Sequence, residues 1–205
     1  MEARPPEVAV APIVAADEEE FISAVRSSRA LHHPWIDLAD TPRRFASMLE
    51  RLGHEDQRAY LLRHDCGGLI GYVSVGNIVR GAFLSAYLGY GAFAGHEGRG
   101  LMSKGLRAVV RIAFGELGLH RVEANIQPGN TRSLALVGRL GFEKEGFSPR
   151  YLMVDGAWRD HERWALRNPA MEAGSMEAGS GEAGSGQAGS GRVEAPSTAG
   201  GLDAL

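Results

Sequence analysis

The 205 residues of this chain are 44% hydrophobic and 23% charged, and the formal net charge at pH 7 is −3. Basic residues are scattered along the sequence, so the composition excludes the strong positive field of a nucleic-acid-binding protein. The single cysteine excludes an internal disulfide, and no spacing of histidines or acids is typical of a metal site, so we expect no metal.

The composition divides the chain into two parts. From about residue 169 the sequence becomes a degenerate Glu-Ala-Gly-Ser repeat, which has too few large apolar side chains to offset the entropy cost of ordering. We therefore predict a folded domain at residues 1–168 and a disordered tail at residues 169–205. The tail contains five acids and one base, so the folded part is close to neutral.

The first part of the domain is predicted to contain one strand, two helices and three further strands. They are expected at residues 8–14 (strand), 17–28 and 42–52 (helices), and 59–64, 69–77 and 83–91 (strands). The first helix begins with Asp17 as a cap and three glutamates, which suit a helix N-terminus. The apolar run at 8–16 is too short to span a membrane and contains Pro12, so we expect a cytoplasmic protein without a membrane partner.

The last of these strands leads through a bend into Gly98, Arg99 and Gly100 and then into a helix. The helix is predicted because apolar residues recur at steps of three and four; they are Met102, Leu106, Val109, Val110, Ala113 and Leu117. Glycines let the backbone approach a ligand, and the first turn of a helix presents unpaired N–H groups with partial positive charge. The pattern favours a site for a diphosphate, although an ordinary turn would use the same glycines.

The remaining elements complete the domain. They are a strand, a helix and two closing strands, expected at residues 120–127, 130–140, 147–154 and 158–166. This order predicts an α+β fold with a mixed sheet flanked by helices. About 165 residues suffice for a domain that is stable alone, and we expect a monomer or a weak dimer.

Several motifs, in their order along the chain, are similar to those of the GNAT acetyltransferases. They are the glycine loop, the strand after it, the Asn130-x-x-Ser133 helix start and the LGF-x-x-EG run at residues 140–146. Within that superfamily, five runs resemble the RimJ/RimL group of ribosomal-protein alanine N-acetyltransferases; they lie at residues 77–83, 87–90, 98–102, 139–146 and 155–161. The resemblance covers most of the predicted domain.

The resemblance implies a GNAT fold, in which a mixed and mostly antiparallel twisted sheet is flanked by helices, with acetyl-CoA as the co-substrate. It implies that backbone groups of Leu88, Gly89 and Tyr90 bind the pantetheine arm and polarise the thioester. The other cofactor-binding residues that it implies are Gly98, Arg99, Gly100, Leu101, Met102, Ser103, Asn130 and Ser133. Asn130 is also a good helix cap, and the two roles are compatible.

Ser133 is the candidate acid. Many GNAT enzymes use a tyrosine one turn further along this helix, but that position is Val137 here. In the RimJ/RimL group a serine three residues after the asparagine takes its place, and this chain resembles that group. A thiol with a pKa of about 8.5 leaves readily, so one hydroxyl within hydrogen-bond reach is a sufficient acid. Ser133 could equally be an ordinary polar residue of the first helical turn.

No residue is singled out as the base. Glu123 and Asn125 are two positions apart and therefore lie on the same face of the strand at 120–127. Asn125 falls where some protein N-terminal acetyltransferases carry a catalytic glutamate. An asparagine cannot take a proton. Glu123 therefore remains as a candidate base through a water molecule, or else as an ordinary surface or salt-bridged glutamate.

The acceptor groove is expected beside the early helices and the hairpin at residues 77–83, with Trp35, Asn77, Arg80 and Tyr151 as substrate-binding residues. We predict transfer of an acetyl group from acetyl-CoA to the N-terminal α-amine of an Ala- or Ser-starting ribosomal protein, without direct nucleic-acid contact. The alternatives are a small-amine acetyltransferase acting on an antibiotic, a polyamine or an amino acid, and a non-catalytic acyl-CoA-binding module.

Overall fold

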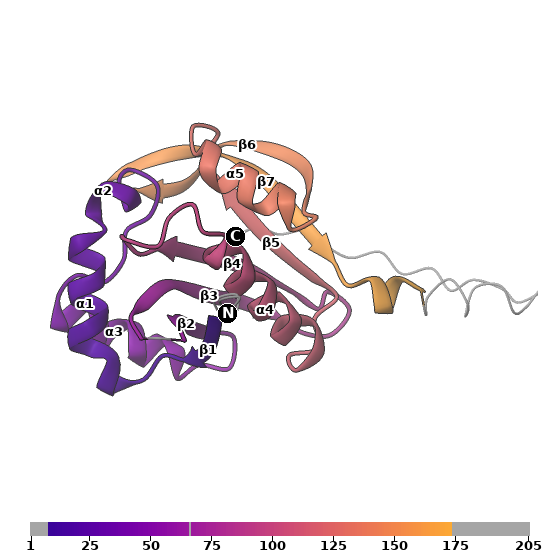
Figure 1. Ribbon diagram of the computed structural model, residues 1–205. Coiled ribbons are helices and arrows are strands. Elements are labelled where there is room, and N and C mark those ends of the chain that lie inside the picture. The colour runs from indigo at the N-terminus through magenta and orange to yellow at the C-terminus, as the bar shows by residue number, and fades with distance from the viewer. Residues whose placement is uncertain (1–7, 66, 174–205) are drawn as a thin grey trace, which may run out of the picture.

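A seven-stranded mixed sheet forms the centre of the structure, a computed structural model that describes residues 8–65 and 67–173 (Figure 1). The strands are β1 (Val8–Pro12), β2 (Arg58–His64), β3 (Leu69–Val79), β4 (Ser85–Ala92), β5 (Arg121–Ile126), β6 (Glu143–Val154) and β7 (Ala157–Arg167). Their spatial order is β1-β2-β3-β4-β5-β7-β6, and every neighbouring pair is antiparallel except β4 and β5. The predicted α+β class and the mostly antiparallel sheet are confirmed.

Helices cover both faces of this sheet. They are α1 (Glu18–Ser27), α2 (Arg29–His32), α3 (Pro42–Leu52), α4 (Leu101–Gly115) and α5 (Thr131–Arg139). Figure 1 shows α1 and α3 on one side of the sheet and α4 on the other. Successive strand side chains point to opposite faces, so in β2 Leu62 packs in the core that contains α4, whereas Leu61 packs in the core formed with α1 and α3.

Each core is filled by large apolar side chains. On the α4 side, Leu106, Val109 and Ala113 are fully buried, as the spacing of apolar residues in that helix predicts. On the other side, the ring centroid of Phe21 lies 5.4 Å from that of Phe45 and 5.8 Å from that of Phe93, within the range of favourable aromatic pairs. The sheet is therefore anchored from both faces.

The parallel strands β4 and β5 separate part of the way along their length. Their pairing covers three residue pairs, which end at Tyr87 and Glu123. Beyond that point β4 stays paired with β3 up to Ala92, and β5 stays paired with β7 up to Ile126. The facing edges of the two strands therefore have no ladder between them, and the sheet opens into a V with accessible backbone groups.

Several element boundaries differ from the predicted ones. α2 was not predicted, because four residues are too few to show a helical period. β4 begins at Ser85 and not at Phe83, since the intervening Leu84 has a φ of 41°, which does not fit a strand. β6 begins at Glu143, four residues before its predicted start, because the charged run there shows no strand-like alternation.

The predicted tail begins with an ordered turn. Residues 169–173 are helical, and Glu172 Oε1 lies 2.8 Å from Nε2 of His120. The amides of Met171 and Glu172 donate to the carbonyl of Asn168. The rest of the predicted tail, residues 174–205, lies outside the described residues. In the part of the chain that the structure describes, no helix is long and apolar enough to cross a membrane.

Candidate active site

A cleft of about 1860 Å³ occupies the V between β4 and β5, and residues from both faces of the sheet line it. Most of the predicted site residues are among them: Trp35, Asn77, Leu88, Gly89, Tyr90, Gly98, Gly100, Leu101, Met102, Ser103, Asn130, Ser133 and Tyr151. The fold thus brings together residues that the sequence separates by more than a hundred positions.

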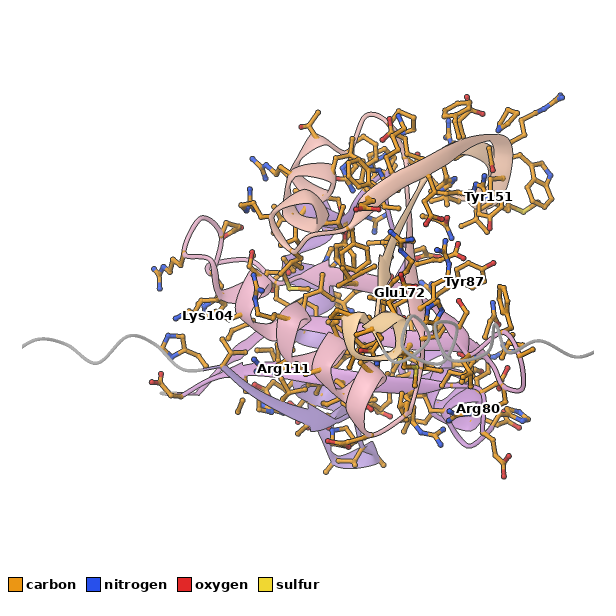
Figure 2. The ribbon with its side chains drawn as sticks, turned by 90° about the vertical axis from the view of Figure 1, so that its right-hand side faces the viewer. Arg80, Tyr87, Lys104, Arg111, Tyr151 and Glu172 are labelled. Carbon is orange, nitrogen blue, oxygen red and sulfur yellow. The ribbon has the colours of Figure 1, made fainter. Side chains whose placement is uncertain are left out.

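Two predicted arginines do not line this cleft. Arg80, expected to bind substrate, donates instead from Nη1 to the carbonyl of Leu117. Figure 2 shows Arg80 well apart from Tyr87 and Tyr151, which lie in the region of the cleft. Arg99, expected at the cofactor, is exposed and lies outside the lining. The long side chain of Arg80 therefore links the turn after β3 to the segment that follows α4.

Glu123, the candidate base, also lies outside the cleft lining. It is 8% exposed, and its Oε1 lies 2.9 Å from Nε of Arg121. The same guanidinium donates to Glu145, and these charge-assisted bonds raise the pKa of Arg121 well above its usual range. Glu123 is therefore held in an ion pair, which is the alternative that the sequence left open for it.

The glycine loop has the backbone geometry that its glycines allow. Gly98 and Gly100 have φ values of 73° and 71°, in the left-handed region that side chains disfavour. The first N–H groups of an α-helix have no intrahelical partner. Gly100 is the N-cap of α4 and has no side chain to accept a hydrogen bond from them. Glu97, beside the loop, accepts the amide of Gly95 at 2.8 Å.

The cofactor side of the cleft fits a phosphorylated ligand. Arg132 and Arg139 from α5 line it together with the α4 N-terminus, and their positive charge favours phosphate groups. Nδ1 of His96, another lining residue, is buried and has no partner among the described residues, so a ligand group could satisfy it. No three His, Cys, Asp or Glu side chains in the described residues gather into a metal-binding group.

A tyrosine from β4 contacts the start of α5. Asn130 caps α5, because its side chain accepts a hydrogen bond from the amide of Ser133 at 3.2 Å. The Ser133 Oγ lies 2.6 Å from the hydroxyl of Tyr90, and both side chains line the cleft. Burial raises the pKa of Tyr90 to about 12. This hydroxyl therefore keeps its proton throughout the physiological range.

The opposite face of the V carries a second group of polar side chains. Val122, Ala124 and Ile126 belong to the core on the α4 side, so the alternating Asn125 points to the other face. Tyr151 lies there against Tyr87. Burial and, to a smaller extent, the hydrogen bond between the two tyrosines raise the pKa of Tyr151 to about 12.

His161 is a cleft residue that the sequence reasoning missed. It lines the cleft from β7, is 3% exposed, and its ring centroid lies 5.9 Å from that of Tyr151. Its Nδ1 lies 2.9 Å from the carbonyl oxygen of Arg159. Because a carbonyl only accepts, Nδ1 carries the proton and Nε2 is left as an acceptor. The sequence signal that could have identified His161 is the DGAWRDH run at residues 155–161, which supports the family resemblance and ends at this histidine.

The loop that follows α2 packs against the segment that leads from β5 into α5. The side-chain amide of Gln127 donates from Nε2 to the carbonyls of Pro34 and Trp35 at 3.3 and 3.4 Å. The ring of Trp35 lies so close to Gly129 that a Cβ added there would be 3.1 Å from it. Trp35 is therefore held against the loop that leads into α5.

Comparison with known proteins identifies the family. Residues 8–143 match the family described as "Acetyltransferase (GNAT) domain". The "[Ribosomal protein uS5]-alanine N-acetyltransferase" of Escherichia coli K12 is 39% identical over 150 residues, which are 69% of this chain and 77% of that protein.

Solved structures agree with this assignment. Mycobacterium smegmatis RimJ in complex with CoA-disulfide has a TM-score of 0.74 at 27% identity, over 84% of this chain and 88% of that one. Spermidine N-acetyltransferase from Vibrio cholerae, in complex with CoA and spermine, has a TM-score of 0.68 over 79% of this chain and 96% of that one. At 16% identity, it shows the fold alone. This chain belongs to the GNAT acetyltransferase family, with RimJ-type relatives, and is an acetyl-CoA-dependent N-acetyltransferase.

Proposed function

We propose that this enzyme acetylates the N-terminal α-amine of a protein, that of an Ala- or Ser-starting ribosomal protein. The observation that carries the proposal is a cleft that passes through the sheet, with the glycine loop and Ser133 on the α4 side and Tyr87, Tyr151 and His161 on the other. Acetyl-CoA, bound from the α4 side, supplies the activated acetyl group. The sequence relationship to an enzyme named for uS5 alanine acetylation supports this acceptor.

The charges of the cleft favour a singly charged acceptor over a polyamine. Among the described residues that line it, the acids are Asp37, Glu97 and Asp155. Asp37 pairs with Arg44 at 2.7 Å and Asp155 lies 3.6 Å from His33, while Glu97 accepts a loop amide on the cofactor side. A polyamine carries several ammonium groups and needs unpaired carboxylates to replace water around them.

An α-amine also needs less free energy for deprotonation than a lysine side chain does. With a pKa of about 8, an α-amine loses its proton at pH 7 for about 1.4 kcal/mol, whereas a lysine near 10.4 costs about 4.6 kcal/mol. A weak base is therefore sufficient. We assign this role to Nε2 of His161, directly or through a water molecule, because burial lowers the pKa of His161 and keeps the imidazole neutral at pH 7.

In this mechanism, backbone groups of Leu88, Gly89 and Tyr90 on the open edge of β4 orient the thioester and polarise its carbonyl. The amine attacks from the face that carries His161. Ser133 donates a hydrogen bond to the departing sulfur, whose thiol pKa of about 8.5 makes it a ready leaving group. Loop amides from Gly98 to Ser103 hold the diphosphate.

A peptide-library acetylation experiment tests the acceptor. Ala- and Ser-starting peptides should gain one acetyl group at the N-terminus in mass spectrometry, and the same peptides with a blocked N-terminus and an internal lysine should gain none. Turnover should rise with pH through the pKa of the amine near 8, since His161 is already neutral there. Acetylation of spermidine but of no peptide would refute the proposed acceptor.

A further inference from the structure

We propose that Tyr90 is a positioning residue that holds the Ser133 hydroxyl with its proton directed at the departing sulfur. Tyr90 would thus supply, from β4, the phenol that α5 does not carry in this chain. The inference rests on the proposed role of Ser133 as the hydrogen-bond donor to the sulfur. It does not depend on which amine is the acceptor.

The geometry of the two hydroxyls carries this inference. Tyr90 and Ser133 lie 43 positions apart in the sequence, yet their oxygens are 2.6 Å apart in the cleft. The backbone of Ser133 is fixed independently, because its amide donates to the Asn130 side chain. One turn further along α5, Val137 is fully buried in the core, so that position contributes no hydroxyl to the cleft.

The direction of the hydrogen bond follows from what each group can do. A serine hydroxyl has one proton and two acceptor sites, and a phenol has one proton of its own. If Tyr90 donates to Ser133 Oγ, the proton of Ser133 remains free for a third atom. If Ser133 donated to Tyr90, its proton would be used. Negative charge developing on sulfur favours the first arrangement, in which two aligned hydroxyl dipoles polarise each other.

The chain of hydroxyls acts by hydrogen bonding and not as a proton relay. As the new C–N bond forms, the C–S bond breaks and its electron pair goes to sulfur, while the amine proton goes to His161 or water. Transfer of a proton from a buried phenol with a pKa of about 12 to a thiolate near 8.5 has an equilibrium constant that is unfavourable by about three and a half orders of magnitude. Both hydroxyls therefore keep their protons, and the thiolate takes its proton from solvent.

A double-mutant cycle tests the inference. Tyr90→Phe keeps the ring and removes the hydroxyl, so kcat should fall about three- to tenfold, the value of one neutral hydrogen bond. The KM values for both substrates should stay within about twofold, since binding is not the step affected. In the Ser133→Ala background, Tyr90→Phe should have no further effect on kcat, because its partner is already gone.

Tyr60→Phe is the matched control. Tyr60 is a buried tyrosine of β2 in the same core, outside the cleft lining. Its loss of a hydroxyl should leave kcat unchanged, and the melting temperature of each variant reports any general loss of stability. Wild-type kcat in Tyr90→Phe, or effects of Tyr90→Phe and Ser133→Ala that multiply in the double variant, would overturn the inference.

The cycle separates failure of this inference from failure of the proposed acceptor. If the wild-type enzyme acetylates no peptide, the acceptor proposal fails, and the cycle is measured with whichever amine is acetylated. Acetyl-CoA hydrolysis without an acceptor breaks the same C–S bond and gives a second measure of sulfur departure. A non-additive cycle in both assays supports Tyr90, and an additive cycle in either contradicts it.

Discussion

Gly100→Val should raise the KM for acetyl-CoA about five- to thirtyfold. Gly100 has a φ of 71° and forms the N-cap of α4, and a left-handed conformation costs a residue with a Cβ roughly 1–2 kcal/mol. A Cβ built at Gly100 would meet no atom within 4 Å, so crowding adds nothing and the penalty is conformational. When the free variant relaxes its loop, binding must restore the loop geometry, and 1–2 kcal/mol corresponds to that factor in affinity.

Steady-state rates at varied acetyl-CoA concentration, combined with thermal unfolding, measure this effect. If the loop instead keeps its strain, the same free energy appears as a lower melting temperature, so the two readouts together account for the penalty. Gly100→Asn is the control, because asparagine tolerates the left-handed region, and its KM should lie much closer to wild type. Wild-type KM in the valine variant, with an unchanged melting temperature, would remove this loop from the cofactor site.

Three further predictions concern the groups around the site. Burial lowers the pKa of His32 and of His161 below the ordinary value of 6.5; the stability that they contribute is therefore complete above pH 6.5 and is lost as the pH falls through the lowered pKa. Replacing each by Gln should flatten the decline of the melting temperature in acid. Glu123→Gln should lower stability by roughly 1–3 kcal/mol through its broken ion pair but leave turnover near wild type; a collapse of turnover would make Glu123 the base. Truncation after residue 173 should change neither stability nor turnover, whereas truncation after Asn168 should lower the melting temperature through loss of Glu172, and equal melting temperatures would contradict this.

Local signals in the sequence predicted much of the fold. Apolar spacing predicted α4, and the Asn130-x-x-Ser133 spacing predicted the cap that the structure shows, because both depend on residues a few positions apart. The glycine loop was likewise expected immediately before this helix, and Gly98 and Gly100 lie there. These features need no knowledge of how distant segments pack.

The remaining features depend on distant contacts. The Tyr90–Ser133 pair requires β4 and α5 to meet across the V, and nothing local to either residue signals it. Arg80 was expected at the acceptor from its place near a hairpin, but its length lets it reach the carbonyl of Leu117. His161 faces the cleft because of the β6–β7 register, which includes an irregularity between Ser148 and Leu152.

The short seam between β4 and β5 has a mechanical consequence. Three residue pairs join two much longer sets of strands, β1–β4 on one side and β5–β7 on the other, so few interstrand hydrogen bonds oppose a change in the angle between them. A ligand in the V contacts both sets of strands at once, so it keeps them apart and also holds them together. Filling the cleft therefore fixes the angle between the set that carries Tyr90 on β4 and the set that carries His161 on β7 and packs against α5 with Ser133.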